Sequence, residues 1–122
     1  MTDYYVDNSG VQQGGFDDGA SPEGGFPENW VLVSLPPQFV DQIWDKKSKS
    51  WGDSLIERSL AEDSWRLSEV QFVENQILLL QVSDPSALPG EINDWDLYLS
   101  KVKLWKQGNK DFPDNQKRPM RP

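Results

Sequence analysis

Apolar residues in the second half of the chain recur at helical spacing. The pattern becomes helical from Ser54 onward, and Asp63 and Ser64 are candidate caps for a longer helix over Trp65–Val82. Within that range, one face of the helix is formed by Val70, Val73, Ile77 and Leu80. Because these residues lie three or four positions apart, they fall on one side of an α-helix, and we expect that side to be apolar.

A second helix is predicted to begin near residues 92–94. Its apolar face carries Trp95, Leu99, Val102 and Trp105. Acidic residues near its start and lysines near its end match the helix dipole, and Gly108 is a plausible stop. Asp84-Pro85 and Pro89-Gly90 make a short connection between the two helices, so we expect an antiparallel pair.

The first part of the chain has the pattern of short strands and turns. Tyr4–Val6 and Val11–Phe16 flank the turn residues Asp7–Gly10, which predicts a β-hairpin. After a glycine-rich and proline-rich loop, Trp30–Ser34 is a further apolar strand, and Pro36-Pro37 ends it. A small antiparallel sheet is therefore expected in this region.

Two tryptophans predict a second small hairpin. Trp44 and Trp51 flank a polar, charged stretch that can form a turn. The fold class that follows is α+β, with a small antiparallel β subdomain over residues 1–53 and a helical hairpin over residues 54–109. Residues 110–122 are rich in proline and poor in apolar side chains, so they are expected to form an extended tail.

Charge narrows the range of partners. The 122-residue chain has a formal net charge of −8, and phosphate binding needs clustered lysine and arginine, so we expect no nucleic acid partner. Residues 1–30 hold six acids and no bases, whereas residues 101–122 hold seven bases and two acids. These ends are solvated separately, or they attract each other, or the acidic end meets a basic partner. No apolar run approaches the length that spans a membrane, and no membrane partner is expected.

The chain lacks the side chains that most enzymes and metal sites use. It has no histidine and no cysteine, which removes the commonest general base and metal ligand and every thiol nucleophile. Asp17-Asp18-Gly19 is acidic but lacks the spacing of a calcium loop, so a solvated turn is expected. We therefore predict a protein that is not an enzyme, with no catalytic residues, no metal site and no cofactor.

Aromatic residues are abundant for a chain of this size. Six tryptophans are present, and most are expected in the core, although one or two could anchor a protein interface. The residues predicted as the partner-binding region of the β part are Trp30, Leu32, Phe39, Trp44 and Trp51. Together with the missing histidine and cysteine, this composition favours a protein that binds another polypeptide.

The order of several short motifs resembles the tail fibre assembly proteins of tailed phages. Residues 4–10 (Tyr-Tyr-Val-Asp-x-Ser-Gly) and 14–24 (Gly-Gly-Phe-x-Asp-Gly-Ala-x-Pro-Glu-Gly) are similar to the opening hairpin and Pro-Glu-Gly segment of that family. Pro36-Pro37, Ile43–Asp45 and Trp51 are similar to its Trp-Asp hairpin. Trp95, Tyr98 and Val102, then Phe112-Pro113, Arg118-Pro119 and Arg121-Pro122, resemble its closing helix and tail.

The chain also departs from the family pattern. Leu99 follows Tyr98 where the family often has arginine, and Arg118-Pro119 and Arg121-Pro122 stand where it usually has tryptophan-proline. The stretch from Trp65 to Leu80 is more apolar than the middle of the family.

The resemblance implies a chaperone that binds the distal C-terminal region of a tail fibre protein. Such fibres are trimeric and rich in β-structure, and they expose unpaired strand edges before they assemble. The implied location is the cytoplasm of the bacterial host, and retention on the fibre tip of the virion is the other implied fate.

Three alternatives stay open at the level of sequence. A virion component at the fibre tip would bind a host-surface glycan through exposed aromatic side chains. A small hydrolase that depends on two carboxylates would hold them close together, with shifted pKa values, in a cleft. A self-associating domain would use the stripe from Val70 to Leu80 as its seam.

Overall fold

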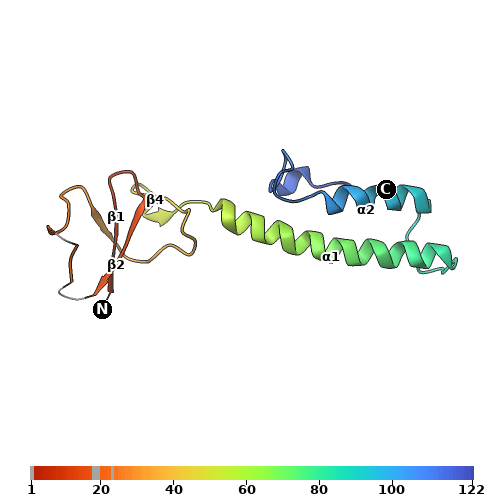
Figure 1. Cartoon of the computed structure of the whole chain (residues 1–122), viewed down its shortest axis with the longest axis horizontal. Coiled ribbons are helices and arrows are strands. Elements are labelled where there is room, and N and C mark those ends of the chain that lie inside the picture. Colours follow the sequence, from red (N-terminus) through yellow and green to blue (C-terminus); the bar gives the residue numbers. More distant parts are fainter. Residues whose placement is uncertain (1, 18–19, 23) are drawn as a thin grey trace. The chain divides into compact units, whose positions relative to one another are not determined.

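The computed structural model describes residues 2–17, 20–22 and 24–122. The chain divides into two compact units, Met1–Ser54 and Leu55–Pro122. The first contains two small antiparallel sheets and the second contains two helices, so the α+β fold class predicted from the sequence is confirmed (Figure 1). The predicted turn at Asp18-Gly19 lies outside the described residues.

The N-terminal unit is built on a three-stranded sheet. Its strands are β1 (Thr2–Val6), β2 (Gln12–Asp17) and β3 (Val31–Val33), in the order β2-β1-β3, with both neighbours antiparallel to β1. The predicted first hairpin is therefore confirmed, with its return strand one residue later than expected. Val11 instead makes an isolated bridge to Ile43, and the ladder has a bulge between Tyr5 and Val6.

The turn of the first hairpin also anchors the second sheet. The Asp7 side chain accepts backbone N–H groups from Ser9 at 2.8 Å and Val11 at 3.1 Å, which closes the turn. Gly10 takes φ +86°, and its carbonyl accepts the N–H of Trp44 at 2.9 Å. Strands β4 (Trp44–Asp45) and β5 (Ser50–Trp51) form the predicted second hairpin, in which Trp44 pairs directly with Trp51.

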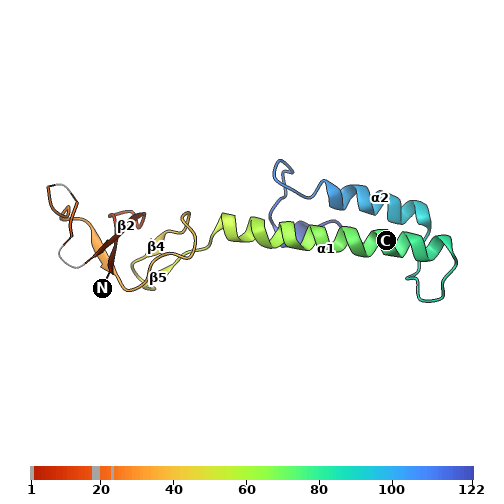
Figure 2. The same cartoon turned by 60° about the horizontal axis from the view of Figure 1, so that its bottom comes forward.

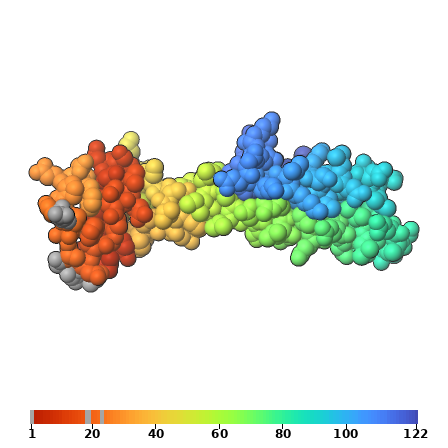
Figure 3. All heavy atoms as spheres, in the orientation of Figure 1, coloured from red at the N-terminus to blue at the C-terminus, as the bar shows by residue number. Residues whose placement is uncertain are grey.

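The second unit is a helical hairpin made of α1 (Leu55–Gln81) and α2 (Ile92–Lys103). Both cartoon views show the two helices side by side, and the space-filling view shows them in close contact (Figures 1, 2 and 3). Val73, Trp95, Tyr98 and Val102 form the buried centre of the interface. Val70, Ile77 and Leu80 pack around this centre, as the sequence predicts. Helix α2 packs against this stripe, so much of the apolar surface proposed as a self-association seam is in contact within the chain.

Helix α1 begins earlier than its predicted cap. It runs without interruption from Leu55, so Asp63 and Ser64 lie inside it and cap nothing. No glycine or proline interrupts residues 55–65, so nothing there favours a helix boundary. Asp63 instead accepts a 2.7 Å hydrogen bond from Arg66, one turn further along the helix.

The end of α2 and the tail differ most from prediction. The helix ends at Lys103, before Gly108, because Trp105 turns into the core, where its side chain is almost fully buried. The extended tail expected for residues 110–122 is wrong for its first half. Asp114 accepts the N–H of Gln116 at 3.0 Å and caps a 3-10 helix over Asn115–Lys117, and the chain becomes extended only at Arg118.

Candidate functional site

The five predicted binding residues do not form one site. Trp30 belongs to an aromatic cluster over the first sheet, and Trp44 and Trp51 pack on each other in the second. Leu32 is 56% exposed, and Phe39 is half-buried in the loop between β3 and β4. Trp30 and Leu32 lie close together in the chain, at the first sheet. The pair Trp44 and Trp51 lies in the second sheet, so the structure splits the predicted region in two.

One face of the first sheet carries an aromatic cluster. Tyr5 stacks on Phe26 with ring centroids 4.4 Å apart, and Phe16 packs edge-on to Phe26 at 5.3 Å. Trp30 lies 6.3–6.5 Å from each of these rings. Leu32 pairs directly with Tyr5 across the ladder, so its side chain emerges on this same face. The cluster therefore continues, through Leu32, to the edge strand β3.

The second sheet carries a pair of packed indoles and borders an open hollow. Trp44 and Trp51 meet edge to face at 5.4 Å, and the Trp51 Nε1–H donates to the Leu35 carbonyl at 3.0 Å. A hollow of about 610 Å³ is lined by residues that include Gly10, Trp44 and Lys46. The indoles are half-buried, so they stabilise the hairpin and leave part of their surface accessible.

A different site, built from charged residues, lies on the helical unit. Two carboxylates of α1, Glu62 and Glu69, are only 3% and 6% exposed. Each binds one arginine from the tail, Glu62 binding Arg118 and Glu69 binding Arg121. We call the surface formed by Glu62, Trp65, Glu69 and Phe72 the arginine groove.

Glu62 is the centre of a buried hydrogen-bond network. Its two carboxylate oxygens accept from Nε and Nη2 of Arg118, each at 2.6 Å, and one of them also accepts the Trp105 Nε1–H at 3.0 Å. The hydrogen bonds from Arg118 hold the pKa of Glu62 below its usual value, against the opposing effect of burial. The same pairing raises the pKa of Arg118, so both groups are charged at neutral pH.

The second half of the groove repeats the first. Nε and Nη2 of Arg121 donate to a single oxygen of Glu69, at 3.0 and 2.6 Å. The guanidinium carbons of Arg118 and Arg121 lie 4.6 and 4.0 Å from the ring centroids of Trp65 and Phe72. Each arginine is thus paired with a carboxylate and stacked on a ring, and both interactions favour arginine over lysine.

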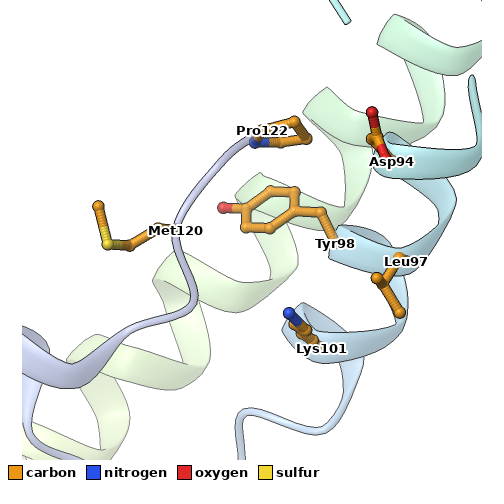
Figure 4. Close-up of a pocket in the computed structure, with 6 residues that line it drawn as sticks. All are labelled: Asp94, Leu97, Tyr98, Lys101, Met120 and Pro122. Atoms are coloured by element: carbon orange, nitrogen blue, oxygen red, sulfur yellow. The ribbon is translucent and has the colours of Figure 1, made fainter. Parts of the chain in front are cut away.

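Tyr98 of α2 borders this part of the groove. Its ring points from α2 toward the tail, between Met120 and Pro122, in a pocket of about 320 Å³ that Asp94, Leu97 and Lys101 complete (Figure 4). Burial, followed by the charge of Glu69, raises the pKa of the Tyr98 phenol, while Arg121 acts in the opposite direction. The hydroxyl therefore stays protonated at neutral pH.

The arginine groove is not among the sites that the sequence predicts. A signal was present, because Glu62 and Glu69 are seven residues apart and each is followed three residues later by an aromatic residue. The arginines of the tail are three residues apart, and each precedes a proline. Nothing in the sequence says that these two repeats meet, since the residues that pair lie 56 and 52 positions apart in the chain.

Comparison with protein-family models, with curated proteins and with solved structures gives no match for this chain. In the part of the chain that the structure describes, no helix is both long and apolar enough to cross a membrane. Likewise, no three acidic side chains among the described residues gather as a metal site requires.

Proposed function

We propose that this protein is a tail fibre assembly chaperone that binds the distal region of a fibre protein through its N-terminal unit. The observation that carries the proposal is the edge strand β3, whose Leu32 is exposed beside the aromatic cluster. The proposal also rests on the motif order of residues 4–51, which falls in this same unit.

The chemistry of an edge strand suits such a partner. An edge presents unpaired backbone N–H and C=O groups, and an extended segment of another protein can pair with them as an added strand. Val31 and Leu35 are exposed next to Leu32, so apolar side chains accompany this edge of the sheet. A fibre chain that has not yet trimerised exposes the same kind of edges, and covering one of them suppresses wrong pairing.

The test is co-expression with a long tail fibre protein, chosen as the product of the neighbouring reading frame if that frame encodes one. We expect the fibre to change from insoluble material to soluble trimer when the wild-type chain is present. Leu32→Lys, which places a charge on the edge strand, should lower the yield of soluble trimer toward the level without the chaperone. A fibre that folds equally well alone removes the basis of the proposal.

A matched control separates the edge strand from general surface effects. Leu67 is also exposed, but it lies on α1, so Leu67→Lys makes the same chemical change in the other unit. It should leave the yield of trimer unchanged. If the two variants act alike, the contact does not lie at β3. If the chain binds a glycan without the fibre and is found in purified particles, the fibre-tip alternative is supported instead.

A further inference from the structure

The geometry points to a second binding site, which lies on the helical unit and goes beyond the proposed fibre contact. We propose that the arginine groove is a recognition site for an extended partner segment that carries two arginines three residues apart. Within the chain, the groove is occupied by residues 118–121 of the tail, Arg-Pro-Met-Arg. These residues compete with such a partner for the groove.

The two halves of the groove have the spacing of two helical turns. Glu62 and Glu69 are seven residues apart on α1, which places them on the same face and about 10 Å apart along the helix axis. Trp65 and Phe72 follow them with the same offset of three residues. The helix therefore presents the same carboxylate and ring twice.

An extended arginine pair matches that spacing. Arg118 has φ −55° and ψ 147°, close to the polyproline II conformation, and Pro119 fixes φ of the next residue in the same range. This conformation has three residues per turn and rises about 9 Å over three residues. Side chains at positions 118 and 121 consequently point to the same side, at nearly the separation of the two glutamates.

The groove is specific in chemistry and not only in charge. The side-on pair between Arg118 and Glu62 uses two parallel N–H groups, which lysine cannot supply. Met120, between the two arginines, is 87% exposed. It lines the pocket beside Tyr98 but takes no part in either arginine–glutamate pair, so these pairs do not fix the residue at this position of a partner segment.

Charge identifies the occupant as a basic segment of another protein. With the tail in place the two carboxylates are almost fully buried under its guanidinium groups, so a segment that displaces the tail must supply two cations at the same positions to keep this pairing. The tail is tethered close by, with an effective concentration of roughly millimolar for a short connection. A partner segment must overcome this effective concentration to displace the tail. The tail is therefore an intramolecular competitor for the groove.

The test uses the full chain carrying Arg118→Gln and Arg121→Gln, in which the tail can no longer fill the groove. The probe is a fluorescent peptide of residues 114–122. We expect saturable binding of this peptide, and binding at least about tenfold weaker for a peptide with lysine at both arginine positions. On the wild-type chain the arginine peptide should bind only near millimolar concentration.

Further variants make the experiment decisive. Adding Glu62→Gln and Glu69→Gln to the double variant should abolish binding of the arginine peptide. Equal binding of the two peptides, or no binding to a double variant that retains its helical circular dichroism, overturns the proposal. If the wild-type chain forms dimers that the two arginine substitutions abolish, the occupant is the tail of a second copy, and the proposed partner segment is wrong.

A second measurement applies if the double variant does not fold. In the wild-type chain labelled with ¹⁵N, the Nε–H signals of Arg118 and Arg121 report the closed groove. Excess unlabelled arginine peptide should move both signals to the position of free arginine, and the lysine peptide should not. Signals that stay unchanged at several times the millimolar effective concentration overturn the proposal.

Discussion

Removing Arg118 should cost more stability than removing the charge of its partner. In Arg118→Leu, the carboxylate of Glu62 stays buried and keeps only the Trp105 indole as a donor. In Glu62→Gln, the unpaired group is Arg118, whose side chain is 32% exposed and can turn toward water. The same ion pair is broken in both variants, but only Arg118→Leu leaves a charge without access to solvent.

The contacts of Glu62 and Arg118 set the size of the expected losses in unfolding free energy. Breaking a buried ion pair by removing one partner costs about 3–5 kcal/mol, and the partial exposure of Arg118 reduces this to about 2–3 kcal/mol for Arg118→Leu. Glu62→Gln keeps an acceptor for the Trp105 indole, so we expect about 1 kcal/mol, the usual net value of a lost hydrogen bond. The combination of both substitutions should be less destabilising than Arg118→Leu alone.

The stability lost in Arg118→Leu should depend on pH. In the wild-type chain, Arg118 lowers the pKa of Glu62, so the stability from this group is present above its unfolded value of 4.5 and is lost as pH falls through the folded value. Without Arg118, burial outweighs the Trp105 hydrogen bond and raises that pKa. The difference in stability between wild type and Arg118→Leu should therefore shrink as pH falls.

Urea unfolding followed by helical circular dichroism measures these differences at pH about 7 and about 3. The helical signal reports on the second unit, which contains α1 and α2. Two results would refute the reasoning. One is equal destabilisation by Arg118→Leu and Glu62→Gln at neutral pH, and the other is a cost of Arg118→Leu that does not change on acidification.

Other substitutions test the packing of each unit. Val73→Ala removes a fully buried side chain between the helices and should cost about 2–3 kcal/mol in urea unfolding, whereas Leu78→Ala, at an exposed position of α1, should stay within about 0.5 kcal/mol. Gln76→Leu removes two hydrogen bonds to the backbone of the α1–α2 loop, at 2.7 and 2.9 Å, so loop amides should exchange faster with solvent and stability should fall by about 2 kcal/mol. Gly10→Ala adds a methyl group at φ +86° against the carbonyl of Trp44, so the near-ultraviolet signal of the N-terminal unit should weaken while the helical signal persists.

Local pattern was sufficient for the elements of both units. Alternation and turn residues predict the two hairpins, and the apolar period predicts α1, α2 and the face they share. These features depend on neighbours in sequence, because side-chain direction repeats every two residues in a strand and every 3.6 in a helix. Element ends were less certain. The start of α1 was misplaced because a polar pair inside a helix has the same composition as a cap.

The sequence by itself determined the class of the fold, the hairpins and the apolar helix faces, since each follows from residues close together in the chain. Only the tertiary structure decided that Trp105 leaves its helix to donate to Glu62, and that the tail returns to place Arg118 and Arg121 on α1. It also decided that Trp30 lies at one small sheet and Trp44 and Trp51 in another, so the predicted binding residues form no single site. Contacts between residues about forty or fifty positions apart form where a buried charge is paired with an opposite charge. The local period of apolar residues does not show which charges will pair.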